Sequence, residues 1–327
     1  MLAKHGDEAL PVIKNGDSLV KSVFGLDDSA AESFIKIASK QDDEFFDAVA
    51  KSSDPDKVIE FVAKYTDDGA EIFTKYGDDA IAAVNACDAP YKAVQIIKNG
   101  GTQYGEQAVQ AIKKSGDKAV EALTKVPTKD CAEIISKINN NVIDLINKLD
   151  VDEAKRFLET VHKQDDSLIK ILNESSDSEN YVSLITKYND DGIDIVNLLE
   201  VNRPKLKTNI NTAFFWSGRT DGIGGEEVAK KIAKDNGGTT LELMIENNGI
   251  KMPEWSDDPI VQVKWGEISR VYAEQVEGEV RAVVGESLRE GNIWETIELP
   301  RLMNNPNVTK IITIDPKTLK EKVIFVR

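Results

Sequence analysis

Apolar residues in the first two thirds of the chain recur in pairs at helical spacing, such as Ile81 with Val84 and Val120 with Leu123. Between the pairs lies a short polar motif in which a Gly-Asp step follows closely after Lys. Close copies have their glycines at Gly6, Gly16, Gly77 and Gly116, and looser copies occupy residues 64–68, 104–108 and 187–191. Several neighbouring copies lie about 10 or 11 residues apart, and such a period indicates stacked repeats.

The residues of this motif are typical of the point where one helix ends and the next begins. A Lys in the last turn suits the helix dipole, and the following Gly or Asn takes the left-handed conformation that ends a helix. The next Asp is expected to cap the following helix. Acidic pairs such as Asp42-Asp43 and Asp165-Asp166 are expected to cap helices too, while facing solvent. Because each unit is too short to bury a core alone, residues 1–204 are predicted to form an α-helical repeat array.

The pattern changes at Pro204, which disfavours helix in the residue before it. Beyond this point the Gly-Asp motif stops, and strands alternate with helices. Strands are predicted at 213–216, 308–314 and 323–326, and helices at 226–234 and from about 261 to 284. Residues 205–327 are therefore predicted to form a compact α/β domain, and the whole chain to be an α+β protein.

Charge narrows the possible partners. The 327 residues carry a formal net charge of -16, and a field of this sign repels nucleic acid and anionic membranes. No stretch approaches the roughly 18 consecutive apolar residues of a membrane span, and the first residues lack the apolar run of a secretory signal. We expect no nucleic-acid partner, no membrane span, and action in the cytoplasm. The protein either stays there or is secreted or delivered by a route that this chain does not encode.

Few reactive side chains are available to the second domain. Both cysteines, Cys87 and Cys131, and both histidines, His5 and His162, precede it. Catalytic triads with His, Cys nucleophiles and HExxH zinc sites are therefore unavailable there, and no metal or cofactor is predicted. Glu227 stands where a G-x-G-x-x-G fingerprint needs its last glycine, and no P-loop is present, so the common nucleotide-binding fingerprints fail as well.

Four segments of this domain combine aromatic, hydroxyl and carboxylate side chains. They read F-W-S-G-R at 215–219, T-T-L-E at 239–242, W-x-x-I-S-x-x-Y at 265–272 and W-E-T-I-E-L-P at 294–300. In the third segment, Trp265, Ser269 and Tyr272 share one face of a predicted helix. In the fourth, alternation predicts an extended stretch with Trp294 and Glu298 on the same side.

One reaction suits this set of side chains. Cleavage of an N-ribosyl bond passes through an oxocarbenium-like state, which a carboxylate stabilises or traps, as in glycoside hydrolysis. A nicotinamide leaving group is cationic in the substrate and departs neutral, so it needs no general acid. A tryptophan face can hold that pyridinium ring by cation–π attraction of about 0.5–2 kcal/mol.

The order of the four segments resembles the ADP-ribosyl cyclase family, including the cysteine-free NAD-consuming toxin domains of bacteria. The resemblance covers roughly residues 211–315. Vertebrate members of the family have a disulfide-rich framework, which this domain lacks. In the family's pattern the Glu after a short [ST]-[IV] pair is the catalytic carboxylate, and here Thr296-Ile297 places Glu298 in that position.

The resemblance also implies roles for the other residues. Trp216 and Trp265 match the two tryptophans of the pocket, and Glu242 matches the T-L-E glutamate that contacts the nicotinamide end and influences product choice. The groups expected to hold phosphate or ribose are Ser217, Arg219 and Ser269; Trp294 corresponds to an aromatic near the adenine or ribose side, and Thr296 completes the substrate-binding set.

The sequence thus predicts an NAD glycohydrolase, with or without cyclase activity, in which NAD is the substrate and no cofactor is needed. The layout of a helical array followed by an NAD-consuming domain resembles polymorphic toxins, which would require a cognate immunity protein. Two alternatives remain open. One is a non-catalytic NAD or ADP-ribose binder on a helical-repeat scaffold, and the other is a toxin nuclease, which the acidic balance and the missing histidines disfavour.

Overall fold

The computed structural model describes residues 1–327, and contacts within the chain divide it into two compact units, Met1–Asp190 and Asp191–Arg327. The chain is 67% helical, and all strands lie in the second unit, where five of them form a mixed sheet. These observations confirm the predicted α+β class. The division between the units falls one helix before residue 204. None of the helices combines the length and the apolarity that crossing a bilayer requires.

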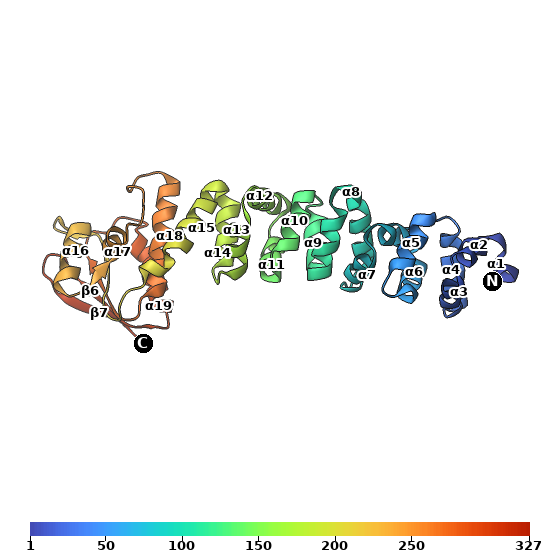
Figure 1. Cartoon of the computed structure of the whole chain (residues 1–327). Coiled ribbons are helices and arrows are strands. Elements are labelled where there is room, and N and C mark those ends of the chain that lie inside the picture. The colour runs from blue at the N-terminus through green and yellow to red at the C-terminus, as the bar shows by residue number, and fades with distance from the viewer. The chain divides into compact units, whose positions relative to one another are not determined.

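The first unit consists only of helices, which follow one another in chain order (Figure 1). Its core contains the apolar pairs expected from the sequence, since Ile81, Val84, Val120 and Leu123 are all buried. The helices are α1 (Leu2–His5), η1 (Gly6–Ala9), α2 (Leu10–Lys14), α3 (Asp17–Phe24), α4 (Asp28–Ala38), α5 (Asp43–Lys51), α6 (Pro55–Tyr76), α7 (Asp78–Asn85), α8 (Pro90–Ser115), α9 (Asp117–Lys125), α10 (Lys129–Lys137), α11 (Asn140–Lys148), α12 (Val151–His162), α13 (Asp166–Glu174) and α14 (Ser178–Tyr188).

The glycines of the repeated motif act as joints between helices. Gly77 ends α6 and starts α7 with φ 58° and ψ -145°, and Gly116 joins α8 to α9 with φ 54° and ψ -135°. Glycine reaches this positive φ without steric penalty, so the predicted positive φ is confirmed, but the ψ values differ from those of the left-handed helical conformation that the motif predicted. Thr66, inside α6, adopts the same conformation with φ 57° and ψ -140°, which a β-branched residue tolerates poorly.

The aspartate after each joint does not have the predicted role. Asp78 and Asp117 are the first residues of their helices, and neither helix has a side-chain cap at its preceding glycine. The carboxylate of Asp117 instead accepts hydrogen bonds from the backbone N–H groups of Asp88 and Ala89, at 2.8 and 3.2 Å, in the loop before α8. Asp78 binds the loop at Ser53 in the same way, at 2.9 Å. The prediction of own-helix capping is therefore wrong for these two residues, because the carboxylate joins neighbouring repeats.

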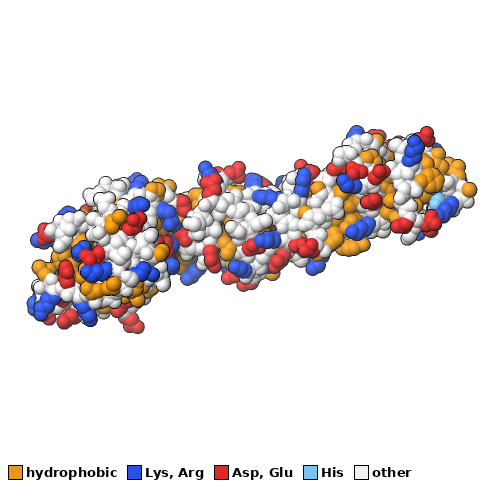
Figure 2. Space-filling model, turned by 90° about the horizontal axis from the view of Figure 1, so that it is seen from below, with side chains coloured by type: hydrophobic (Ala, Val, Ile, Leu, Met, Phe, Trp, Pro, Cys, Tyr) orange, Lys and Arg blue, Asp and Glu red, His pale blue; other side chains and the backbone are white.

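Other acidic residues do cap their own helices. Asp42 accepts from the backbone N–H of Phe45, and Asp165 accepts from that of Ser167, as predicted. Oppositely charged side chains lie interspersed over the face drawn in Figure 2. Ion pairs also link successive repeats, among them Lys113–Asp79 at 2.5 Å, Lys118–Asp144 at 2.5 Å and Lys137–Asp166 at 3.2 Å.

The second unit is built on a five-stranded sheet with strand order β4-β1-β5-β6-β7. Strands β4, β1, β5 and β6 are parallel, and β7 pairs antiparallel with β6. The elements from the unit boundary onward are α15 (Asp190–Asn202), η2 (Arg203–Leu206), β1 (Ala213–Ser217), β2 (Arg219–Thr220), β3 (Ile223–Gly224), α16 (Glu226–Asp235), β4 (Thr239–Thr240), α17 (Leu241–Asn247), α18 (Pro259–Gln275), β5 (Gly278–Val284), the π-helix η3 (Trp294–Glu298), α19 (Leu299–Asn304), β6 (Val308–Ile314) and β7 (Glu321–Val326).

Alternate side chains of β1 pack on opposite faces of this sheet. Phe214 belongs to a cluster with Ala229 and Ala233 of α16. Phe215 points the other way, with ring centroids 4.9 Å from Tyr272 of α18 and 6.0 Å from Trp294 of η3. Helices thus cover both faces, as parallel strands require.

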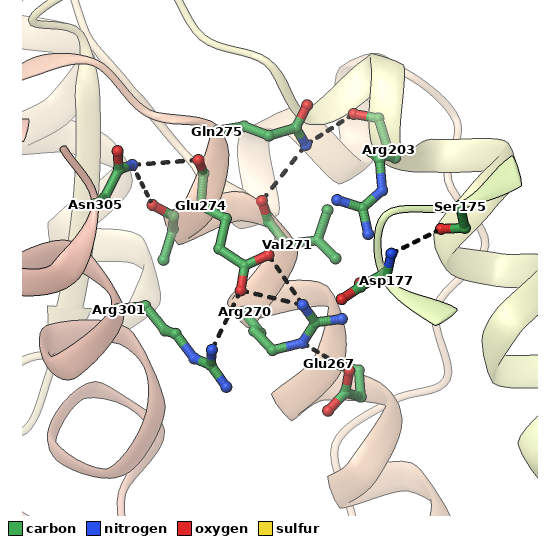
Figure 3. A network of polar contacts seen from close by, with 11 residues as sticks. Ser175, Asp177, Arg203, Glu267, Arg270, Val271, Glu274, Gln275, Arg301 and Asn305 are labelled. Carbon is green, nitrogen blue, oxygen red and sulfur yellow. Dashed lines mark hydrogen bonds and ion pairs between the residues drawn. The ribbon is translucent and has the colours of Figure 1, made fainter. Parts of the chain in front are cut away.

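The predicted helix from 261 to 284 is wrong in its second half, because α18 ends at Gln275 and β5 follows. The end of α18 is fixed by Asn305, whose side-chain amide donates to the carbonyl groups of Ala273, Glu274 and Val276 at 3.0–3.2 Å (Figure 3). Gly278 then takes φ 80°, which turns the chain into the strand.

Helix α18 is also held by charge. Arg270 is 4% exposed, and its guanidinium binds Glu267 and Glu274, each at 2.9 Å (Figure 3). Gln275 donates to the carbonyl of Arg203 at 2.9 Å, and Leu206 is fully buried. Arg203 and Leu206 therefore attach this segment to the second unit, while Pro204 and Lys205 between them are exposed.

Candidate functional site

The topology of the sheet marks one place where a ligand site is expected. The chain leaves β1 toward β4 and leaves β5 toward β6, so the connections diverge at the adjacent strands β1 and β5. In open parallel sheets, ligands bind beyond the carboxyl ends of strands at such a switch point. Ser217 ends β1, Thr240 ends β4, and residues 285–293 follow β5. The predicted site residues Trp216, Ser217 and Glu242 all lie at this edge.

Glu298 is the last residue of η3 and is only 6% exposed. Burial raises the pKa of its carboxyl from 4.5 to about 8, a hydrogen bond with Ser269 lowers it, and the charge of Glu242 raises it again. Ser269 is itself buried, on α18. The predicted residues Glu298, Ser269 and Glu242 therefore lie close enough to interact, although they come from three different elements.

Glu242 stands in the first turn of α17, directly after β4. Its Oε1 accepts a hydrogen bond from the indole N–H of Trp216 at 2.8 Å, while its Oε2 is buried without any partner. Burial raises the pKa of this carboxyl, and its own backbone N–H and the Trp216 indole lower it. A buried carboxylate oxygen without a partner is costly, and such an oxygen is available to a donor on a ligand.

Tyr272 lies in the same environment. It is fully buried, and its hydroxyl donates to the carbonyl of Thr239 at 3.1 Å. Burial raises the pKa of Tyr272 well above its ordinary value, and the negative charges of Glu242 and Glu298 raise it further. The predicted helical face of Trp265, Ser269 and Tyr272 is present in α18, and its inner end adjoins the two glutamates.

The predicted extended stretch at 293–300 is wrong, because residues 294–298 form a π-helix that continues into α19. The cause is Asn292, a buried residue that the sequence did not single out. Its Oδ1 accepts from the backbone N–H of Glu295 at 3.0 Å and from the hydroxyl of Ser217 at 3.2 Å. Its Nδ2 donates to the carbonyl of Arg289 at 2.8 Å and to Glu295 Oε2 at 2.6 Å. Asn292 thus starts the π-helix and fastens it to the end of β1.

This change alters two further expectations. Trp294 is 3% exposed and packs against Phe215, so it belongs to the core and is not accessible to the adenine or ribose of a substrate. Thr296 is exposed, and its hydroxyl donates to the carbonyl of Asn292 at 2.8 Å, so it stabilises the π-helix. Gly266 of α18 allows the π-helix to pack closely against α18, since a Cβ at this position would lie 2.9 Å from Ile297 Cδ1.

Arg219 and Trp265 lie at the margin of the site. Arg219 is exposed on β2, with its guanidinium lying beside Gly225, where a Cβ would be 3.3 Å from Nη2. Trp265 is half-buried, and its indole N–H donates to the carbonyl of Pro253 at 3.0 Å. Trp265 therefore also anchors the loop between α17 and α18. No group of three His, Cys, Asp or Glu side chains is arranged to hold a metal ion.

Comparison with protein-family models, with curated proteins and with solved structures finds no match for this chain. The site is therefore classified by its geometry. At the C-terminal edge of a parallel sheet lie two carboxyl groups with raised pKa values, those of Glu242 and Glu298. The indole N–H of Trp216 donates to the first, and the hydroxyl of Ser269 hydrogen-bonds with the second.

Proposed function

We propose that the second unit cleaves the nicotinamide–ribose bond of NAD, as an ADP-ribosyl-cyclase-like glycohydrolase. The observation that carries this proposal is the buried carboxyl of Glu298, beside Ser269 and within electrostatic range of Glu242. Strongly shifted carboxyl groups gathered at a switch point are typical of catalytic sites.

The chemistry follows from the two carboxyl groups. Burial penalises their charged forms, so a cationic ligand is favoured because it compensates for that penalty. The nicotinamide ring of NAD carries this positive charge, and its binding would ionise Glu298. As the N-ribosyl bond breaks, the positive charge moves to the ribose, where the Glu298 carboxylate stabilises or traps it. Nicotinamide leaves as a neutral molecule.

Glu242 would orient the leaving group. Its free Oε2 can accept a hydrogen bond from the carboxamide N–H of nicotinamide, while Trp216 holds Oε1 at 2.8 Å. The assignment of Glu242 to the nicotinamide end is thus supported by an unpaired acceptor that the ligand can satisfy. Ser269 would keep the Glu298 carboxyl in place.

The test is incubation of the purified chain with NAD, followed by chromatographic separation of nicotinamide, ADP-ribose and cyclic ADP-ribose. The proposal expects release of nicotinamide together with ADP-ribose, cyclic ADP-ribose or both. ADP-ribose alone would define a hydrolase, and cyclic ADP-ribose alone would define a cyclase. If NAD remains intact while ADP-ribose binds, the unit is a non-catalytic nucleotide binder. That alternative is favoured by the neutral state of Glu298 below pH 8 in the free protein.

For the biological role, we propose an NAD-depleting toxin that acts in the cytoplasm and is held in check by an immunity protein. Arg219, Trp216 and Trp265 would anchor such a partner, since Arg and Trp are common interface anchors. The burial of Trp294 removes it from this surface. Expression in a naive bacterium should arrest growth with a falling NAD pool, and Glu298→Gln should relieve the arrest. Normal growth with measurable cleavage and an intact NAD pool would contradict the toxin role.

A further inference from the structure

Trp255 is the most exposed of the four tryptophans, at 41%, and the site described above does not use it. The guanidinium of Arg289 lies over its ring, 4.9 Å from the centroid. A cation held on one face of an indole leaves the opposite face to a second planar group. An exposed Trp backed in this way is a ready stacking surface for a nucleobase.

Both partners of this pair are anchored to the candidate site. Trp255 lies in the segment between α17 and α18, two residues after Pro253, whose carbonyl accepts from the Trp265 indole. Arg289 lies in the segment between β5 and η3, and its carbonyl accepts from Asn292. The same segment pairs with Arg219 through two backbone hydrogen bonds at Ser287, of 2.9 and 3.1 Å. The pair therefore joins two loops that border the carboxyl edge of the sheet.

The charged side chains around Trp255 determine whether a phosphate or a base of a nucleotide can lie next to its ring. Arg289 places one positive charge on the ring, but the neighbouring residues Glu254, Asp257 and Asp258 are three exposed carboxylates, so together these charges disfavour a phosphate next to the ring. An uncharged aromatic base suffers no such repulsion. The side chains thus favour the base of a nucleotide as the group that contacts Trp255.

We propose that Trp255, with Arg289 behind it, stacks the adenine base of the dinucleotide while the nicotinamide end lies at Glu242 and Glu298. This inference rests on the proposed function and extends it to the distal half of the substrate. Nicotinamide mononucleotide contains the scissile bond without the adenylate half. Trp255 therefore distinguishes the dinucleotide from the mononucleotide.

The test compares steady-state cleavage of NAD and of nicotinamide mononucleotide by the full chain. Trp255→Ala should raise KM for NAD about 10-fold, with kcat within about twofold of wild type, because stacking is lost before the reaction begins. Cleavage of nicotinamide mononucleotide should not change. Trp255→Phe should restore most of the affinity, and Gln262→Ala, an exposed residue near the start of α18, serves as the control.

A purely structural role for Trp255 would impair both substrates equally, and that result would overturn the proposal, as would unchanged KM values. Calorimetric titration with ADP-ribose separates this inference from the proposed function. Weaker binding of ADP-ribose by Trp255→Ala supports the stacking site even if NAD is not cleaved. Equal affinities of wild type and variant, or no binding to either, would refute it.

Discussion

In the helical unit, the aspartates of the repeated motif lie at the surface and bind the loops of neighbouring repeats, as Asp78 and Asp117 do. In the second unit, Glu242 and Glu298 are withdrawn from solvent at the end of a sheet. The hydroxyl of Ser52 holds the pKa of Asp78 below its usual value, whereas burial raises that of Glu298 to about 8. The aspartates of the joints thus stabilise the first unit, whereas Glu242 and Glu298 are buried in the second unit at a cost to their charged forms.

That cost is informative about function. The hydrogen-bonded carboxylates at the surface of the first unit have a structural role, because they hold loops of neighbouring repeats in place. The two carboxyl groups of Glu242 and Glu298 instead have raised pKa values, and one of them has an unpaired oxygen, so burial disfavours their charged forms in the free protein. The two kinds of carboxylate should therefore respond differently to pH and to mutation.

Apart from the removal of Glu298 itself, the largest effect is expected in the pH dependence of catalysis. The value of kcat/KM for NAD reports the free enzyme, so it should rise roughly 50-fold between pH 6 and pH 8 as Glu298 ionises. The kcat profile should be displaced to lower pH, because the bound pyridinium favours the carboxylate. A value of kcat/KM that is constant from pH 6 to pH 8 would mean that Glu298 is already ionised or does not take part.

Asn292 is expected to be a positioning residue for η3. Asn292→Asp keeps the acceptor for Ser217 but replaces the donor to Glu295 with a repelling charge, so kcat should fall about 10-fold. A shift of η3 would also expose Glu298, so the midpoint of the kcat/KM profile should move below pH 8. Asn236→Ala, which removes a side-chain bond at the end of α16, is the control. If the midpoint of the kcat/KM profile does not change in Asn292→Asp, Asn292 stabilises the fold but does not position Glu298.

Unfolding should reveal different pH responses in the two units above pH 6. Between the ordinary pKa of 4.5 and about 8, Glu298 binds its proton more tightly when folded, so stability of the second unit falls as pH rises, by a few kcal/mol. The lowered pKa values of Asp68 and Asp78 act in the other direction, and their contribution to the first unit is lost below about pH 4.

Tryptophan fluorescence follows only the second unit, which contains all four tryptophans, and far-ultraviolet circular dichroism follows mainly the helical unit. Raising the pH from 6 to 9 should lower the fluorescence midpoint by roughly 5 °C or more and leave the helical transition unchanged. In Glu298→Gln the fluorescence midpoint should no longer depend on pH in this range. Parallel shifts of both signals would contradict the assignment.

The smallest effect concerns the joints of the array. Thr66 has φ 57° and ψ -140°, nearly the values of Gly77, and nothing would crowd a Cβ at Gly77. Thr66→Gly should therefore stabilise the helical unit by about 1 kcal/mol through relief of backbone strain, and Gly77→Thr should destabilise it by a similar amount. Urea denaturation followed by circular dichroism measures both. Destabilisation by Thr66→Gly would show that its side chain is needed at the joint.

The sequence predicted most of the fold where local chemistry determines it. The repeated Gly-Asp motif indicated the helical array, and β1, α16, β6 and β7 lie where the apolar patterns placed strands and a helix. The end of α18 and the π-helix were missed because side chains distant in the chain determine them. Asn305 caps α18 from 29–32 residues away, and Ser217 binds Asn292 from 75 residues away.

The site was predictable to a similar degree. Glu298, Ser269, Glu242 and Trp216 lie together as the motifs implied, each in a separate element. The alternation in W-E-T-I-E predicted an extended stretch with Trp294 on the same side as Glu298, whereas the segment is a π-helix and the Trp294 ring is buried against Phe215. Asn292 could have been noticed as an Asn three residues before a Glu, a weak signal of a helix start.

The central claim is that Glu298 carries the cleavage of NAD. Its most direct test is nicotinamide release from saturating NAD by wild-type protein and by Glu298→Gln, whose amide has nearly the same shape but no charge. We expect a loss of at least about 10³-fold in Glu298→Gln, with the affinity for ADP-ribose and the fluorescence midpoint at pH 6 retained. Release at more than about a tenth of the wild-type rate would contradict it.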